Sequence, residues 1–293
     1  MGSYRTIDLH MHTTISDGTD PPEKLLAIVK EKGISLFSIT DHDAIRSSWI
    51  IPGLLGRENP DFISGVEFSC KDEQGKYHVL GYGYDPEADS IRRVVETGHS
   101  YRMNKVKARL SFLDREFGFR FPEKEIQDLL KLANPGKPHI GNLMVKYGYA
   151  GTKEEAIKNY INRLHFKGGY VRPEEAIQGI LGAGGIPVLA HPSFGSGDQL
   201  ILGEEMDRRL RRLMQFGLKG VEAFYSGFSP KLQEEILAFA GRYDLYVTAG
   251  SDYHGRNKLV VPGDTGMKTY TPVPEGMERF LADCRILSGR EGV

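Results

Sequence analysis

The sequence predicts a parallel β/α barrel of seven or eight strands that is interrupted by one helical insertion. Three observations lead to this prediction. Short apolar runs alternate with helical stretches near both ends of the 293-residue chain, a long middle segment contains no convincing strand, and polar residues follow the apolar runs. With 40% hydrophobic residues, the chain can bury a full core as one large domain with an insertion.

The N-terminal part reads as a strand, a helix and further strands. "YRTIDLH" is the first apolar run, and "PPEKLLAIVKEKG" is a helix with prolines at its start and a glycine at its end. "SLFSITDHD" is the next strand, and "DFISGVEFSC" and "YHVLGYGYD" follow as two more. This βαβ order is typical of a parallel sheet.

The middle segment, from about Pro86 to His165, is rich in Lys, Arg and Glu and shows helical spacing in "PEKEIQDLLKLA" and in the longer stretch before it. It predicts a helical insertion over residues 86–165, with the barrel formed by residues 1–85 and 166–293. The charges of the insertion either form a solvated helix face or help to cap a substrate. After it, "GIPVLAHP", "GVEAFYS" and "LYVTAGSDYHG" resume the strand pattern.

Composition excludes several classes of protein. The formal net charge of −1 gives no bulk attraction to nucleic acid or to a membrane. Cys70 and Cys284 are the only cysteines, so neither a disulfide framework nor a cysteine zinc site is expected. No apolar run approaches the roughly 18 residues of a membrane span, and no signal peptide precedes the first strand. We therefore expect a cytoplasmic protein.

Two histidines in the first apolar run suggest a metal site. Residues i and i+2 of a strand point to the same side, so His10 and His12 of "IDLHMH" would lie next to each other. Structural or solvated histidines are the alternative, and the pair alone does not decide between them.

Further metal-ligating residue types follow the other apolar runs. The carboxyl ends of strands meet at one edge of a β/α barrel, the edge where such barrels build their active sites. Seven of the nine histidines fall in these contexts, whereas His99 and His165 do not. The residues concerned are Asp41, His42 and Asp43 in "ITDHD", Glu67 in "GVEFS", His78 in "YHVLGY", His139 in "GKPH", His191 in "LAHP", and Asp252 and His254 in "GSDYH".

Taken in order, these motifs resemble the PHP (polymerase and histidinol phosphatase) family, in particular its stand-alone metal-dependent phosphoesterases. The resemblance extends from Ile7 to Gly255 and rests on H-x-H with a following Asp, T-D-H-D, G-V-E, H-x-L-G-Y, A-H-P and G-S-D-x-H-G. It implies a distorted, TIM-like (β/α)7 barrel that holds two or three divalent metal ions. It also implies that the insertion after His78 helps to cover the substrate.

The resemblance further implies how the ligands are shared. One ion would be held by His10, His12, Glu67 and Asp252; Glu67 would bridge to a second ion held by His78 and His191; and a third would be held by Asp17, His42 and His254. Among these, Asp17, His42, His191 and His254 would be the catalytic residues. Nitrogen and oxygen ligands suit Mn, Fe or Zn without selecting one of them. Asp41 and Asp43 are expected to orient or cap, Asp41 by accepting a hydrogen bond from a ligand histidine.

A cluster of cations would lower the pKa of a bridging water and neutralise charge on the phosphate oxygens, so no covalent nucleophile is required. The resemblance implies hydrolysis of phosphate monoesters or diesters, and we expect the substrates to be phosphate monoesters of small nucleotides, either nucleoside monophosphates or 3',5'-bisphosphates. The alternatives are an exonuclease on short RNA or DNA, a histidinol-phosphatase-like enzyme, and a non-catalytic metal-binding scaffold. Intact ligands in every motif argue against the scaffold, and no obligate protein partner is inferred.

Substrate recognition is predicted from two departures from the family pattern. "GKPHIGN" places Lys137 and His139 where Arg and His are commoner, in a loop that would fold over the barrel mouth. A surface turn with a capping histidine is the alternative. Phe228 stands where the resemblance predicts a histidine, and Tyr225, Ser226 and Lys258 are the candidates to replace it in binding the substrate.

Overall fold

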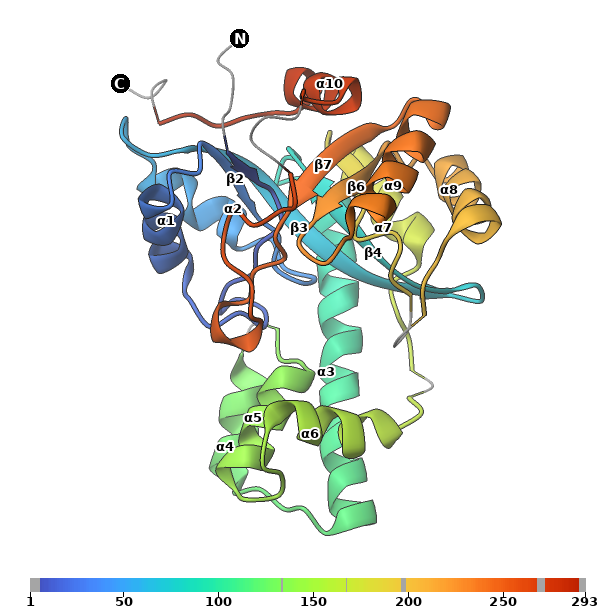
Figure 1. The fold of residues 1–293 in the computed structure, drawn as a ribbon. Coiled ribbons are helices and arrows are strands. Elements are labelled where there is room, and N and C mark those ends of the chain that lie inside the picture. Colours follow the sequence, from blue (N-terminus) through green and yellow to red (C-terminus); the bar gives the residue numbers. More distant parts are fainter. Residues whose placement is uncertain (1–5, 133, 167, 196–198, 268–271, 290–293) are drawn as a thin grey trace.

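A sheet of seven strands in sequence order forms the centre of the computed structural model, which describes residues 6–132, 134–166, 168–195, 199–267 and 272–289 (Figure 1). Neighbouring strands run parallel from β1 to β3 and from β5 to β7. The strands are β1 (Ile7–Asp8), β2 (Leu36–Ile39), β3 (Asp61–Asp72), β4 (Gly75–Tyr82), β5 (Ile186–Leu189), β6 (Gly220–Tyr225) and β7 (Tyr246–Gly250).

The first and last strands meet, so the sheet nearly closes into a barrel. The backbone N–H of Leu9 donates to the carbonyl of Ala249 at 2.9 Å. The carboxylate of Asp8 accepts from the N–H groups of Ser251 and Gly263, which follow β7, at 3.0 and 2.7 Å. Because Asp8 is fully buried, these bonds satisfy a carboxylate that would otherwise be costly to bury. The predicted α/β barrel is confirmed, with seven strands.

One strand runs against the predicted parallel pattern. β4 is antiparallel to both β3 and β5. The physical reason is the short connection, because only Glu73 and Gln74 separate the end of β3 from the start of β4. Two residues are enough for a hairpin, whereas a parallel crossover needs a dozen or more.

Helices cover the outside of the sheet. In α1, the prolines at its start and Gly33 after its end delimit the helix as predicted, and its buried face of Leu25, Leu26 and Val29 packs on β2 and β3. The barrel helices are α1 (Pro22–Glu31), α2 (Ser47–Ile50), α7 (Pro173–Gly182), α8 (Gly203–Gln215), α9 (Pro230–Tyr243) and α10 (Glu275–Asp283), with single 3-10 turns η1 (Pro52–Leu54) and η3 (Gly255–Asn257).

The described residues between β4 and α7 form helices and loops, without a strand of the sheet. They comprise α3 (Asp89–Phe117), α4 (Glu123–Lys131), α5 (Lys137–Lys146), α6 (Lys153–Asn159) and η2 (Ile161–Arg163). In Figure 1, α3 starts beside the barrel and projects away from it, and α4, α5 and α6 lie along its far half. These helices share a hydrophobic cluster that includes Val106, Leu129 and Ile140, separate from the barrel core. We propose residues 86–165 as the bounds of this insertion.

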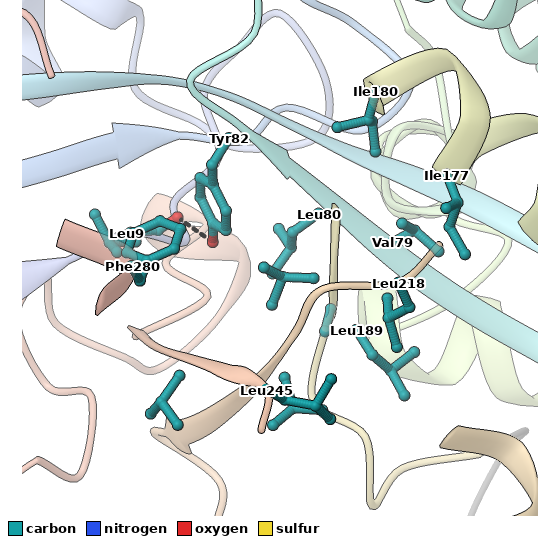
Figure 2. Close-up of a cluster of buried hydrophobic side chains, with 14 of the residues drawn as sticks. Leu9, Val79, Leu80, Tyr82, Ile177, Ile180, Leu189, Leu218, Leu245 and Phe280 are labelled. Carbon is teal, nitrogen blue, oxygen red and sulfur yellow. Dashed lines mark hydrogen bonds between the residues drawn. The ribbon is translucent and has the colours of Figure 1, made fainter. Parts of the chain in front are cut away.

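Aliphatic and aromatic side chains fill the barrel core, as the close-up in Figure 2 shows. Tyr82 on β4 is fully buried, its hydroxyl donates to the carbonyl of Leu9 at 2.9 Å, and its ring meets Phe280 of α10 edge-on at 5.5 Å. A buried tyrosine hydroxyl needs such a partner. This contact ties β1, β4 and α10 together beneath the barrel edge that carries the polar residues. Among the described helices, none has the length and apolar character needed to cross a membrane.

Candidate functional site

The structure brings the nine predicted metal ligands together at one edge of the barrel. Most follow the carboxyl ends of parallel strands, while His78 comes from the antiparallel β4, where it pairs with Ser69 of β3. His10 and His12 follow β1 and are fully buried, and their rings lie side by side with centroids 5.2 Å apart, as predicted. The nine residues are His10, His12, Asp17, His42, Glu67, His78, His191, Asp252 and His254.

Glu67 lies at the centre of this cluster, with imidazoles around both of its carboxylate oxygens. The distances from Oε2 are 3.3 Å to His10 Nε2, 3.2 Å to His12 Nε2 and 3.0 Å to His42 Nδ1, and those from Oε1 are 2.8 Å to His78 Nδ1 and 3.2 Å to His191 Nε2. Burial alone would raise the pKa of Glu67, but the charges of His78, His42 and His10 outweigh it and hold that pKa well below its usual range. Glu67 is therefore ionised.

The two oxygens of Asp252 face different groups. Oδ1 lies 3.5 Å from His10 Nε2 and 3.3 Å from His12 Nε2. Oδ2 instead accepts hydrogen bonds from the Tyr225 hydroxyl at 2.8 Å and from Lys258 Nζ. Asp252 has a left-handed backbone, φ 58°, as does His191 at φ 28°. Non-glycine residues held in this region carry strain and gather at functional sites.

A further group surrounds Asp17. His254 Nε2 lies 3.2 Å from Asp17 Oδ1, and His42 Nε2 lies 4.0 Å from Asp17 Oδ2. His254 Nδ1 lies 2.9 Å from the carbonyl oxygen of Asp252, so a proton on Nδ1 leaves Nε2 with its lone pair toward Asp17. His42 belongs to two groups, because its Nδ1 faces Glu67 while its Nε2 faces Asp17.

These residues fit divalent cations. Nε2 of His10, Nε2 of His12, Nδ1 of His42 and Oε2 of Glu67 are buried without a hydrogen-bond partner. The three nitrogens lie 3.0–3.3 Å from Oε2 of Glu67, which matches the separation of donor atoms that share one ion at bond lengths of about 2.0–2.2 Å. Within the described residues, the donor atoms form three groups, and inside each group they lie within 4.8 Å of one another. The groups are His10, His12, Glu67 and Asp252; His12, Asp17, His42 and His254; and His42, Glu67 and His78.

Comparison with known proteins identifies the family of this chain. The family model of the PHP domain matches residues 8–171, more than half of the chain. The chain belongs to the PHP domain family. It is therefore a metal-dependent phosphoesterase, a hydrolase, and the resemblance drawn from its motifs is confirmed.

Relatives with different activities share most of this PHP chain. A phosphoribosyl 1,2-cyclic phosphate 1,2-diphosphodiesterase of Eggerthella lenta is 29% identical, covering 85% of this chain and 94% of its own. A 3',5'-nucleoside bisphosphate phosphatase of Chromobacterium violaceum is 26% identical over 89% of both chains. A 5'-3' exoribonuclease of Salmonella typhimurium is 28% identical over 84% of both.

Solved structures agree on the PHP fold. A protein of Bifidobacterium adolescentis assigned as a metal-dependent phosphoesterase superposes with a TM-score of 0.78 at 26% identity, covering 95% of this chain and 96% of its own. An amidohydrolase of Chromobacterium violaceum superposes with a TM-score of 0.82 at 22% identity, covering 98% and 99%. At that lower identity the second likeness concerns the fold alone.

Sequence reasoning missed Glu222, a residue of β6 that organises the PHP site. Its Oε1 lies 2.9 Å from His10 Nδ1, and its Oε2 accepts from the backbone N–H of His191 at 2.8 Å. Such a carboxylate fixes the tautomer and orientation of a ligand histidine. The signal in the sequence is the single charge in the apolar run "GVEAFY", which is fully buried in the structure.

Asp41 does not orient a ligand histidine as predicted. Its carboxylate accepts from the N–H of Thr13 at 2.7 Å and from the hydroxyls of Thr13, Ser16 and Ser47 at 2.7–2.8 Å. It therefore holds the loop between His12 and Asp17 in place. Asp43 accepts from the N–H of Ser69 at 2.9 Å and pairs with Arg102 of α3.

Lys137 and His139 do not lie in a loop. Lys137 is the first residue of α5 because Gly136 caps the helix and Pro138 fits its first turn. His139 Nδ1 accepts from the N–H of Gly136 at 3.1 Å, which is the capping role considered as the alternative. Lys137 Nζ donates to Asn162 Oδ1 at 2.6 Å, and Lys137 lines a cavity between the β3–β4 hairpin and the insertion.

Tyr225 and Lys258 lie at the metal-ligand cluster, joined by a 2.9 Å hydrogen bond from Lys258 Nζ to the Tyr225 hydroxyl. Phe228 is buried and packs with Phe194 and Tyr225, at ring centroids of 5.4 and 5.0 Å. The Tyr225 ring in turn lies 5.4 Å from that of His191. In place of the histidine expected there, Phe228 thus supports the aromatic wall beside His191.

Proposed function

We propose that this PHP protein hydrolyses phosphate monoesters of small nucleotides, nucleoside monophosphates or 3',5'-bisphosphates. The observation that carries the proposal is the position of Glu67, whose two oxygens each face different imidazoles at 2.8–3.3 Å. A carboxylate so placed can bridge two cations. The relative from Chromobacterium violaceum that acts on 3',5'-nucleoside bisphosphates supports the substrate class.

The nine clustered side chains would hold two or three divalent ions, Mn, Fe or Zn, with Asp17, His42, His191 and His254 nearest to the reaction. We assign His10, His12, Glu67 and Asp252 to one ion, because their donor atoms form one group. When bound, such ions lower the pKa of water and neutralise charge on phosphate oxygens. His42 would serve either the Asp17 group or the Glu67 group, since a neutral imidazole offers one lone pair.

Tyr225 and Lys258 would bind the substrate phosphate. The Lys258 side chain is one-third exposed, and its ammonium group is held by Asp252 Oδ2 at the rim of the ligand cluster. By occupying Oδ2, Lys258 and Tyr225 also fix the direction of Oδ1, which faces the two histidines that follow β1. The same pair can thus orient a ligand and present a positive charge to a phosphate oxygen.

A second candidate function is a 5'-3' exonuclease on short oligonucleotides. It is favoured by the relatives that are named exoribonucleases and by the basic side chains that α3 places beside β3 and β4. We further propose that the enzyme acts in the cytoplasm, where its two buried, unpaired cysteines would stay reduced, and without an obligate protein partner.

The test is release of phosphate from a panel of esters by protein loaded with Mn, Fe or Zn. The panel contains a nucleoside 5'-monophosphate, a 3',5'-bisphosphate, histidinol phosphate and a labelled short oligonucleotide. We expect the loaded protein to release phosphate from the nucleotides, and we expect EDTA to abolish this release. Cleavage of the oligonucleotide with no release from free nucleotides would favour the exonuclease, and inactivity on the whole panel would overturn the proposal.

A further inference from the structure

A cavity of about 420 Å³ with basic walls lies between the β3–β4 hairpin and the helical insertion. Its cations are Lys71 and Lys76 from the hairpin, Arg109 from α3 and Lys137 from α5. Tyr170 lies in the same cavity, with Lys105 Nζ 3.2 Å and Lys71 Nζ 5.2 Å from the centre of its ring. We name Lys71, Lys76, Lys105, Arg109, Lys137 and Tyr170 the basic pocket.

In the described part of the chain, no cation of the basic pocket forms an ion pair with a carboxylate, and Lys137 donates only to the amide of Asn162. Lys71 and Lys76 are also directly opposite each other in the register of β3 and β4. Like charges that face each other across a strand pair destabilise it. A cavity whose basic side chains form no ion pair with a carboxylate has positive charge available to bind an anion.

Burial of these cations also lowers their pKa values. Burial, with Arg102 next, lowers the pKa of Lys105 to about 7, and burial with Arg109 lowers that of Lys137 to about 8. The pKa of Arg109 likewise falls to about 10, chiefly by burial. A bound anion would favour the charged forms of all three.

The two lysines of the hairpin lie on the same face of β3 and β4 as Glu67 and His78. Residues two apart on a strand share a face, so Glu67, Ser69 and Lys71 of β3 point the same way. On β4, Lys76 shares that face with His78, about 7 Å along the strand. Between the two sites, Arg102 donates to the hydroxyl of Ser69 at 2.9 Å. A substrate whose phosphate lies at Glu67 and His78 can therefore extend along the hairpin toward Lys71 and Lys76.

We propose that the basic pocket binds a phosphate of the substrate other than the one that is hydrolysed. This rests on the proposed function, and it narrows the substrates to nucleotides with at least two phosphates. The second phosphate belongs either to a nucleoside 3',5'-bisphosphate or to the next nucleotide of a short oligonucleotide. A nucleoside 5'-monophosphate has no group for this pocket.

The test compares three substrates with wild type, with a Lys71→Ser and Arg109→Ser double variant, and with Lys107→Ser. Lys107 is an exposed residue of α3 between Lys105 and Arg109 in sequence, but it lies outside the basic pocket. Lys107→Ser is therefore the control for loss of a positive charge near the pocket. The substrates are adenosine 5'-monophosphate, adenosine 3',5'-bisphosphate and a 5'-phosphorylated trinucleotide. Metal content is measured on every variant.

We expect the double variant to lose about tenfold or more in kcat/KM for the bisphosphate, the trinucleotide or both, and less than twofold for the monophosphate. Lys107→Ser should match wild type throughout. A loss confined to the bisphosphate identifies the free nucleotide as the source of the second phosphate, and one confined to the trinucleotide identifies the oligonucleotide. Equal losses on all three substrates, or no loss on any, would overturn the inference.

A binding measurement separates this inference from the proposed function. Calorimetric titrations with the bisphosphate and the monophosphate in EDTA should show tighter binding of the bisphosphate to wild type, weakened by salt and lost in the double variant. If loaded wild type hydrolyses nothing, the proposed function fails while this comparison still decides what the pocket binds. If it hydrolyses nucleotides but binds both ligands equally, only the inference fails.

Discussion

Nδ1 of His10 lies 2.9 Å from Oε1 of Glu222, and both side chains are fully buried. A proton on Nδ1 is then shared with the carboxylate, and Nε2 faces Oε2 of Glu67, 3.3 Å away. The charge of Glu222 comes first among the effects that raise the pKa of His10 well above its usual range, against the lowering effect of burial. Glu222 therefore sets both the direction and the basicity of a proposed metal ligand.

Glu222→Gln should weaken metal binding by about 10–100-fold, because it removes the charge behind His10 and leaves an amide beside the N–H of His191. The measurement is the dissociation constant for Mn or Zn by calorimetry, with circular dichroism to show that the barrel stays folded. Glu234→Gln, an exposed residue on α9, is the matched control. Wild-type affinity in Glu222→Gln would contradict this role.

His12→Ala should lose metal and phosphatase activity together. Nε2 of His12 lies between Oε2 of Glu67 and Oδ1 of Asp252, at 3.2 and 3.3 Å, so its removal opens the group that we assign to the first ion. Elemental analysis of protein purified without chelators measures the metal, and phosphate release measures the activity. His99→Ala, an exposed histidine of α3, should change neither. Full activity of wild type in EDTA would argue against the metal proposal.

The ligand cluster was predictable because parallel strands carry their following residues to one edge. His42 follows β2, His191 follows β5 and Asp252 follows β7, so their neighbourhood depends on topology and not on their distance in sequence. The role of Glu222 was not predicted because this residue lies within β6, and a strand pattern does not show whether a buried charge faces a metal ligand. The antiparallel direction of β4 was also not predicted, although the connection of two residues between β3 and β4 requires it.

The position of Lys137 could not be predicted for a different reason. The sequence shows a proline after the lysine, which fits an extended loop as well as the first turn of a helix. The structure selects the helix, where Ile140 and Met144 of α5 are fully buried against the other insertion helices. Tertiary packing, which the local sequence does not encode, thus decides where Lys137 points.

Lys258→Met should lower kcat/KM for a nucleotide by about 10–100-fold with the metal content unchanged. The ammonium group is not a ligand, and Tyr225 still holds Oδ2 of Asp252, but the charge toward the phosphate is lost. A hydrogen bond to a charged group contributes about 1.5–3 kcal/mol, which corresponds to this range. Steady-state kinetics measure the effect, and the exposed Lys219→Met is the control. Loss of metal from Lys258→Met would show that Tyr225 alone does not hold Asp252 in place, and the kinetic effect would then not measure phosphate binding.

Lys105→Met should stabilise the protein most at low pH. The pKa of Lys105 is about 7 in the folded chain, lowered by burial and by Arg102, against about 10.4 in an unfolded chain. Below pH 7 the lysine is charged in both states, so the folded state bears the full free-energy cost of the buried charge. Between pH 7 and pH 10 only the unfolded chain keeps the proton, so the wild-type free energy of unfolding rises with pH.

The variant lacks this cost at every pH. We expect its free energy of unfolding to exceed that of wild type by about 1–3 kcal/mol at pH 6.5, a range kept below the full pKa shift because the side chain is partly solvated. The difference should shrink toward pH 10. Urea unfolding of both proteins at several pH values measures it, and comparison at each pH cancels the titration of the metal-ligand histidines. Lys107→Met on the exposed side of α3 should show no such trend, and a pH-independent difference for Lys105→Met would show that its charge carries no cost in the fold.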